Sequence, residues 1–231
     1  GCCRSGGAAL GLRQLVHGAA VLKAFRLRFG AEDVDLQQRE QSFRGYFSLE
    51  TLTLRHRLFA GGWSAPVRRE LFQRGDAVGV VPWDPVKDEL VLIEQFRVGA
   101  IRGDDSPWML ELIAGIVEAG ESDITVVHRE AEEEAGCRLG RLEQIATFYP
   151  SAGACSEQIR LFVGEVTHSQ PGTVQGLESE HEDILVHQLP REQVMQMLDR
   201  NGINNGHTLI ALQWLARHAD CLRAQWLAGD S

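Results

Sequence analysis

The chain has 231 residues, of which 24% are charged, and its formal net charge is −9 at pH 7. An acidic chain of this kind is poorly suited to nucleic acid or to an anionic membrane surface, and it contains no apolar run of bilayer length, so we expect neither partner. Its five cysteines lack disulfide or metal-ligand spacing, which favours a reducing compartment, the cytoplasm.

The first twenty residues are rich in Gly and Ala and contain no acid. Their apolar stretch is short and is broken by His17, so it does not fit a secretory signal. We expect 1–20 to be a disordered or non-native leader, with the natural chain beginning near Val21. The length that remains fits one domain with an appendage or two small domains.

Residues 21–75 are expected to form a small N-terminal β-subdomain. Apolar residues alternate with polar ones within 32–75, which predicts a strand through Tyr46, Leu49, Leu52 and Leu54. The segment R-L-F-A-G-G-W predicts a turn, and Val67–Phe72 predicts the next strand. Because this unit has few residues with which to bury a core, we expect it to pack on the following domain or on a second subunit.

The rest of the chain, 76–231, alternates strand and helix patterns, which predicts an α/β domain with a mixed sheet between helices. Strands are expected at 76–83, 89–96, 108–114, 142–149, 159–166 and 184–189. Residues 167–183 are expected to form a long polar loop. Two helices should follow, at 190–198 and from 208 to about 227.

The stretch from Gly115 to Cys137 combines a strand end, a loop and a helix. Ser122 or Asp123 can cap the start of this helix, and Gly136 can end it in the left-handed conformation. At about 100° per residue, one apolar stripe is predicted as the buried face. Its members are Ile124, Val127, Ala131 and Ala135.

Three carboxylates lie together on the flank of that stripe, those of Glu130, Glu133 and Glu134, whereas Glu132 points to the other side. Like charges at this spacing repel one another. A solvated acidic face is the plain interpretation. Binding a hard divalent cation is the alternative, since such cations prefer carboxylate oxygens.

The spacing favours the cation. From Gly115 the sequence runs through five residues to Glu121 and through seven more to R-E-A-x-E-E-x-G-C. This pattern resembles the Nudix box of nucleoside-diphosphate-X hydrolases. All seven fixed identities are present, a coincidence on the order of 10⁻⁸ per window at typical residue frequencies. From about Val21 onward, the chain is similar to the ADP-ribose pyrophosphatase branch of this family, through stretches such as R-G-Y-F-S-L, V-R-R-E-L-F and P-W-M-L-E-L-I-A-G.

This resemblance implies a Nudix α/β/α sandwich, with the N-terminal β-subdomain exchanged between the subunits of a homodimer. It implies two or three Mg²⁺ ions, with Mn²⁺ as a substitute. Their ligands would be Glu130, Glu133, Glu134, Glu182 and the backbone carbonyl of Ala114. Four residues of the box would be structural, namely Gly115, Gly136 and the ion pair of Glu121 with Arg129.

The resemblance also implies roles outside the box. Glu180 would be the general base, and Glu133 is a second candidate for a catalytic role. The substrate would be contacted by Arg97, Glu70 and Glu157, together with Tyr46 and Arg69 contributed across the dimer. Tyr46 would stack on adenine, and the arginines would face the diphosphate or the terminal ribose.

The implied reaction is hydrolysis of ADP-ribose to AMP and ribose 5-phosphate. One departure bears on the substrate, because this branch usually has Ser-Pro-Gly after the box, whereas the chain has Ser151-Ala152-Gly153. That loop helps to shape the terminal-ribose side of the site. The alternatives are another nucleoside diphosphate-sugar, such as GDP-mannose or ADP-glucose, and a non-catalytic module that senses ADP-ribose.

Overall fold

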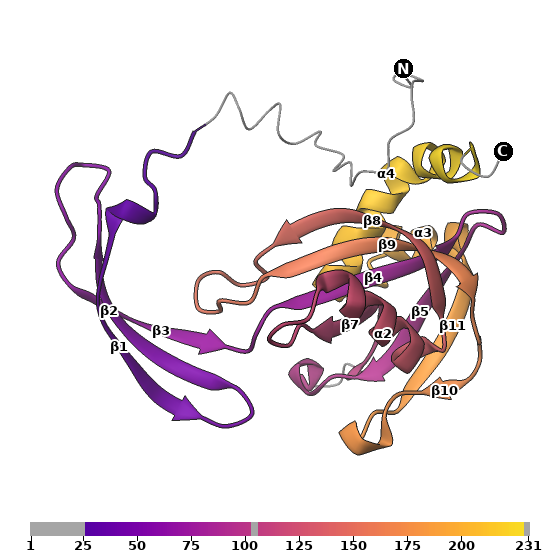
Figure 1. The fold of residues 1–231 in the computed structure, drawn as a ribbon, viewed down its shortest axis with the longest axis horizontal. Coiled ribbons are helices and arrows are strands. Elements are labelled where there is room, and N and C mark those ends of the chain that lie inside the picture. Colours follow the sequence, from indigo (N-terminus) through magenta and orange to yellow (C-terminus); the bar gives the residue numbers. More distant parts are fainter. Residues whose placement is uncertain (1–25, 103–105, 229–231) are drawn as a thin grey trace.

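The computed structural model describes residues 26–102 and 106–228, so the expected leader at 1–20 lies outside the described residues. The described chain forms a three-stranded sheet that stands beside a larger α/β body (Figure 1). Among the helices in these two ranges, none is both long enough and apolar enough to cross a bilayer.

The three-stranded sheet is antiparallel, with its strands in chain order: β1 (Val34–Arg44), β2 (Ser48–His56) and β3 (Val67–Gln73). The prediction of a strand beginning at Tyr46 is wrong, because Tyr46 lies in the bend between β1 and β2. Strand β1 escaped prediction because its sequence, V-D-L-Q-Q-R-E-Q-S-F-R, is mostly polar and nearly all of it is exposed.

The body is built on an eight-stranded mixed sheet. Its main order is β10-β11-β5-β4-β9-β8, while β6 pairs with β5 and β7 pairs with β4. Strands β4 and β9 run parallel, and the remaining pairings are antiparallel. The strands are β4 (Ala77–Asp84), β5 (Glu89–Phe96), β6 (Trp108–Glu111), β7 (Ile113–Ile116), β8 (Arg138–Phe148), β9 (Ile159–His168), β10 (Val174–Gln175) and β11 (Ile184–Pro190).

Two predicted elements need correction. The strand expected at 108–114 is divided at Leu112 into β6 and β7, which pair with different neighbours. The polar loop expected at 167–183 contains strand β10 and the 3₁₀ turn η3 (Glu178–Glu180). The division at Leu112 arises because β6 and β7 pair with different strands. Strand β10 and turn η3 are two and three residues long, too short for an alternation pattern to reveal them.

Three helices cover the sheet: α2 (Asp123–Ala135), α3 (Arg191–Asp199) and α4 (Gly206–Ala228). Helix α2 lies on one face, and α3 and α4 lie on the other (Figure 1). Strand β5 shows how the sheet serves both layers. Leu90 and Leu92 pack into the core on the α4 side, and Val91 and Ile93 pack into the core on the α2 side. The predicted mixed α/β sandwich is therefore confirmed.

The end of β3 is held to the body by the loop between β8 and β9. The backbone N–H of Phe72 donates to the carbonyl of Ala154 at 2.7 Å, and the N–H of Ser156 donates to the carbonyl of Phe72 at 3.2 Å. The Ser156 hydroxyl also donates to the side-chain oxygen of Gln73. This joint (72–73 with 154–156) attaches the three-stranded sheet next to the end of the body that carries the box.

Candidate active site

Helix α2 begins and ends where the local signals predict. The Ser122 hydroxyl oxygen accepts from the backbone N–H of Thr125 at 3.2 Å, and Gly136 is left-handed with φ of 54°. The predicted buried face is wrong at Ile124, which is 41% exposed, whereas Val126 is fully buried. The buried stripe is rotated toward Val126, which carries acidic residues of the same helix toward the sheet.

Glu134 is the acid most affected by this rotation, with only 3% of its surface exposed. Its Oε2 accepts a hydrogen bond from the backbone N–H of Ala114 at 3.1 Å, which ties α2 to β7. Burial raises the pKa of Glu134 well above its usual value, and the nearby carboxylates of Glu130 and Glu182 act in the same direction. The Ala114 N–H and the charge of Arg97 oppose this shift.

Glu130 lies against the backbone of Gly115, where any side chain would collide with it. A Cβ at residue 115 would stand 1.9 Å from Glu130 Oε1. Burial raises the pKa of Glu130 to about 7, and the carboxylates of Glu133 and Glu182 add to the rise although Arg129 opposes it. Gly115 thus provides the space that lets Glu130 approach Glu134.

Arg129 joins the loop before α2 to the helix itself. Its guanidinium lies 3.4 Å from Glu121, 2.8 Å from Glu130 and 3.1 Å from Glu133. Glu121 also accepts from the backbone N–H of Glu118 at 3.1 Å, which closes the turn of the loop. The ion pair expected between Glu121 and Arg129 is therefore present, as part of a larger cluster.

The loop after β10 brings a further acid to this cluster. The backbone N–H of Gly176 donates to the carbonyl of Glu133 at 3.1 Å, which fastens the loop to α2. Glu182 lies near Glu130 and Glu134, since its charge acts on both, and its Oε2 accepts from the N–H of Leu177 at 3.2 Å. The side chain of Glu180 lies outside the described residues, so its expected role as general base stays a prediction.

Arg97 lies close enough to Glu134 for its charge to act on that carboxyl group, and it is held by an acid that the sequence did not single out. Its Nε and Nη2 each lie 2.8 Å from Oε2 of Glu111, which is 3% exposed. Burial, followed by the charges of Arg74 and Arg97, lowers the pKa of His207. Both arginines therefore lie near His207, and Arg97 also acts on Glu134.

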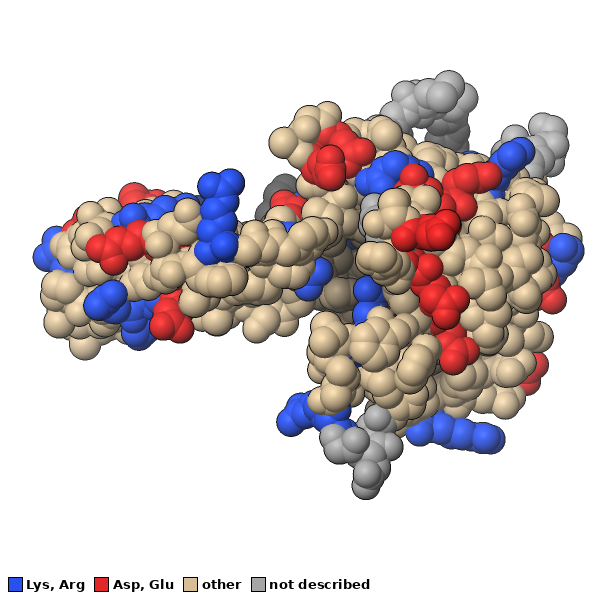
Figure 2. All heavy atoms as spheres, turned by 90° about the horizontal axis from the view of Figure 1, so that it is seen from below, with Lys and Arg blue, Asp and Glu red and all other residues tan. Residues whose placement is uncertain are grey.

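A pocket of about 510 Å³ lies between the β1–β2 bend and the start of the body, with Tyr46, Phe47, Arg74 and Ile116 in its lining. Tyr46 is 90% exposed and meets the Phe47 ring edge-on, with 4.7 Å between centroids. Arg74 lies over the Phe47 ring at 5.4 Å. Basic side chains are visible in the hollow between sheet and body, whereas acidic ones form a line across the body (Figure 2). Since Ile116 follows Gly115, the pocket borders the acids.

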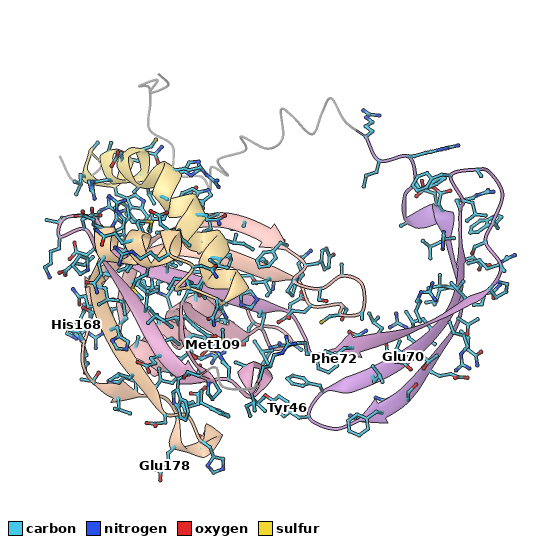
Figure 3. All side chains as sticks on the ribbon, turned by 180° about the vertical axis from the view of Figure 1, so that it is seen from behind. Tyr46, Glu70, Phe72, Met109, His168 and Glu178 are labelled. Atoms are coloured by element: carbon cyan, nitrogen blue, oxygen red, sulfur yellow. The ribbon has the colours of Figure 1, made fainter. Side chains whose placement is uncertain are left out.

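The predicted substrate contacts on the three-stranded sheet differ in their distance from the body. Tyr46 lies at the tip of the β1–β2 hairpin nearest the body, whereas Glu70 lies on β3 on the far side of Phe72 (Figure 3). Arg69 is exposed on β3, and its Nη1 donates to the carbonyl of Arg68. Within one chain, Arg69 and Glu70 are therefore not brought to the box, and their expected roles stay predictions. Tyr46 lines a pocket of its own chain, and its expected contribution across a dimer also stays a prediction.

Glu157 is buried and faces Arg74, with 3.3 Å between Oε1 and Nε. Burial raises the pKa of Glu157, although Arg74 opposes the rise. Glu157 therefore supports a pocket arginine in this structure, and its direct contact with substrate stays a prediction. Arg74 was not predicted, because a lone arginine before a strand gives no local signal.

The acidic cluster fits a divalent cation by its chemistry. Its donors are carboxylate oxygens, the ligands that hard cations prefer. Glu130 and Glu134 lie near one another, and burial raises the pKa of both above the usual range. The side chains as placed do not converge on one point, since no group of three His, Cys, Asp or Glu residues in the described part of the chain has metal-ligand geometry. Glu130 and Glu133 instead contact Arg129.

Comparison with protein families matches residues 73–210, more than half of the chain, to the NUDIX domain. The chain is 46% identical over 198 residues to the ADP-ribose pyrophosphatase of Escherichia coli (strain K12), an alignment that covers 86% of this chain and 95% of that protein. It is 32% identical over 149 residues to the GDP-mannose pyrophosphatase of Escherichia coli (strain SMS-3-5 / SECEC), covering 64% and 77% respectively.

The fold is similar to a solved structure described as an ADP compounds hydrolase. The TM-score is 0.62 and the identity is 22%, and the match covers 88% of this chain and 98% of that one. At this identity the likeness concerns the fold alone.

Proposed function

Since the chain belongs to the NUDIX domain family, we propose that it is a hydrolase that cleaves the diphosphate of ADP-ribose to AMP and ribose 5-phosphate. The observation that carries this proposal is the meeting of Glu130, Glu134 and Glu182 beside Arg97. Acids that bind cations and an arginine that binds phosphate are both needed by a doubly charged diphosphate.

We propose that the acids hold divalent cations, with Mg²⁺ as the physiological choice in two or three positions and Mn²⁺ as a substitute. The ligands would be Glu130, Glu133, Glu134, Glu182 and the carbonyl of Ala114. When bound, such cations neutralise a diphosphate and lower the pKa of a coordinated water.

The chain's own groups account for the rest of the reaction. Arg97, held by Glu111, would bind and orient the diphosphate opposite the acids. Glu180 would accept the proton of the attacking water, whose oxygen bonds to one phosphorus while the bridging oxygen leaves with the other phosphate. Tyr46 would stack on the base at the far end of the pocket.

A second substrate class has support of its own. The relative that is named a GDP-mannose pyrophosphatase is 32% identical, and Ala152 occupies the exposed turn between β8 and β9 where the ADP-ribose branch usually has proline. Hydrolysis of another nucleoside diphosphate-sugar is therefore the alternative function. A non-catalytic ADP-ribose sensor is disfavoured because every acid of the box is retained.

A panel of ADP-ribose, GDP-mannose and ADP-glucose tests the proposal. Each compound is incubated with the protein and a phosphatase that releases phosphate from the products only. We expect the highest kcat/KM for ADP-ribose with Mg²⁺, somewhat altered turnover with Mn²⁺, and none with EDTA. A preference for another sugar supports the alternative, and binding of ADP-ribose without any turnover supports the sensor.

We also propose a homodimer in the cytoplasm. The exposed apolar residues of the three-stranded sheet suit a partner subunit, among them Leu36 and Phe43 on β1, which are 47% and 62% exposed. The thiols of Cys137, Cys155 and Cys221 are all free, which suits a reducing compartment. Sedimentation of the purified protein measures the oligomeric state directly.

A further inference from the structure

The guanidinium of Arg97 is the outermost member of a buried chain of hydrogen bonds that ends at helix α4. Asn205, the residue before α4, donates from Nδ2 to Oε1 of Glu111 at 2.8 Å. The other oxygen of that carboxylate receives both Nε and Nη2 of Arg97. We propose that Asn205 is a positioning residue, which fixes Arg97 toward the diphosphate through Glu111.

The donor and the acceptor of each hydrogen bond in this series are defined. The backbone N–H of Leu112 donates to the Thr208 hydroxyl oxygen at 2.9 Å, and that hydroxyl donates to Oδ1 of Asn205 at 3.0 Å. The backbone N–H of Thr208 donates to the same Oδ1 at 3.0 Å. Since Oδ1 of Asn205 accepts two hydrogen bonds, its amide nitrogen must face Glu111.

Burial makes this arrangement rigid. Thr208 is fully buried and Glu111 is 3% exposed, so neither can exchange its partners for water. A carboxylate with each oxygen engaged on a different side cannot rotate without losing a charge-assisted bond. The plane of the Arg97 guanidinium is therefore set from α4, a segment more than 100 residues further along the chain.

Arg97, held in this way by Glu111, faces the candidate active site around Glu134. Its side chain is 40% exposed although Glu111 is buried, and its charge acts on Glu134. Among the described residues, Nη1 has no carboxylate within ion-pair distance, in contrast to Nε and Nη2. One edge of the guanidinium is thus anchored and another is presented to an anion, which is how the proposed function uses it; the inference rests on that function.

Asn205 also caps α4, and a purely structural role in capping is the competing explanation. Replacing Asn205 by Asp separates the two roles. Aspartate caps a helix as well as asparagine, since its oxygen still accepts from Thr208. It has no N–H to donate, however, so it places a second carboxylate against Glu111.

The experiment compares Asn205→Asp with Asn204→Asp, which makes the same charge change at the exposed neighbouring residue. For Asn205→Asp we expect a KM for ADP-ribose at least about tenfold higher, with kcat within about threefold. The Tm should fall modestly, because two carboxylates then meet where Glu111 is buried, but the protein should remain folded. The Kd for inorganic pyrophosphate in metal-free buffer should rise by a similar factor. Asn204→Asp should match the unaltered protein in every measurement.

An Arg97→Lys background tests the route of the effect. Lysine cannot make the two-nitrogen contact, so adding Asn205→Asp to it should change KM less than twofold. An equal effect in both backgrounds, or a fall in Tm with KM unchanged, would overturn the inference. If Asn205→Asp does not fold, Thr208→Val takes its place, with Thr208→Ser as its control; KM should rise for valine alone.

The two proposals fail in different ways. Absence of ADP-ribose turnover by the unaltered protein contradicts the proposed function. The pyrophosphate measurement needs neither turnover nor the correct sugar, so it still reports on Asn205. Equal pyrophosphate affinity in Asn205→Asp and Asn204→Asp would contradict the positioning role alone.

Discussion

The carboxylate of Glu130 rests on the Cα of Gly115, close enough that a Cβ there would stand 1.9 Å from Oε1. We therefore expect Gly115→Ala to displace Glu130 and to reduce kcat by about 100-fold, the usual cost of an ångström-scale misplacement in a catalytic site. The control is Gly99→Ala, since a Cβ at residue 99 meets nothing within 4 Å. Equal kcat in the two variants would mean that Glu130 is not needed where it lies.

Glu134→Gln should reduce turnover by about three orders of magnitude, because an amide cannot supply the charge that binds a cation. The side-chain oxygen can still accept from the Ala114 N–H, so the fold should be retained. Glu132→Gln is the matched control, since Glu132 is exposed on the opposite side and pairs with Arg138. In a thermal-shift measurement, added Mg²⁺ should raise the Tm of the control and of the unaltered protein but not that of Glu134→Gln.

Tyr46 offers a test of base recognition that is free of stability effects. Because its side chain is 90% exposed, Tyr46→Ala should leave Tm unchanged. Loss of a stacking partner should raise KM for ADP-ribose by about tenfold, and Tyr46→Phe should behave as the unaltered protein. Steady-state kinetics measures both; an unchanged KM in Tyr46→Ala would remove this residue from the site.

Arg69 is too far along β3 to serve the box of its own chain in this structure, so its proposed role requires a partner subunit. Arg69→Ala and Glu134→Gln should each be poorly active at low substrate concentration. When the two are co-expressed, half of the dimers are mixed and each mixed dimer has one intact site, so about a quarter of the activity should return. No recovery beyond the sum of the parents would place Arg69 in its own subunit's site or outside it.

Asp88 connects the β4–β5 turn to both C-terminal helices. It accepts from Arg191 at 2.8 Å and lies 2.6 Å from Arg223. Burial acts to raise its pKa, but hydrogen bonds from Arg191 and Trp83 outweigh burial and hold the pKa below the ordinary 3.8. A lowered pKa means that the stabilisation is complete above the ordinary value and disappears as the pH falls through the folded value.

Asp88→Asn isolates this charge, since asparagine tolerates the positive φ of 59° found here. We expect a loss of about 1 kcal/mol in the free energy of unfolding at pH 7, a modest figure because the side chain is partly exposed. Urea unfolding at pH 7 and pH 3 should show the difference shrinking at the lower pH. A difference that is the same at both pH values would contradict this account.

Local signals in the sequence predicted the parts of the fold that local physics determines. The cap of Ser122 and the left-handed Gly136 follow from backbone preferences over a few residues. Strand β1 was missed because a strand with almost no buried face has no alternation to detect. The burial of Val126 in place of Ile124 depends on how α2 is rotated against the sheet, which only packing decides.

The acidic half of the candidate site was recognisable because spacing within one helix gathers Glu130 and Glu134. The residues that hold its arginine were not. Glu111 follows a run of apolar residues in W-M-L-E-L-I-A, and Asn205 stands in a polar loop, where neither attracts notice. They meet only because β6 and the start of α4 are neighbours in space.

The joint between β3 and the β8–β9 loop is made largely of main-chain bonds, from Phe72 to Ala154 and from Ser156 back to Phe72. Such bonds are indifferent to side-chain identity but sensitive to the number of residues between them. We therefore expect the length of this loop to set the distance between Tyr46 and the acids of the box. Substitutions within the loop, such as Ala152, would leave that distance unchanged. Adding or deleting a residue in the loop would change that distance, and with it the length of the nucleotide sugar that can span the site.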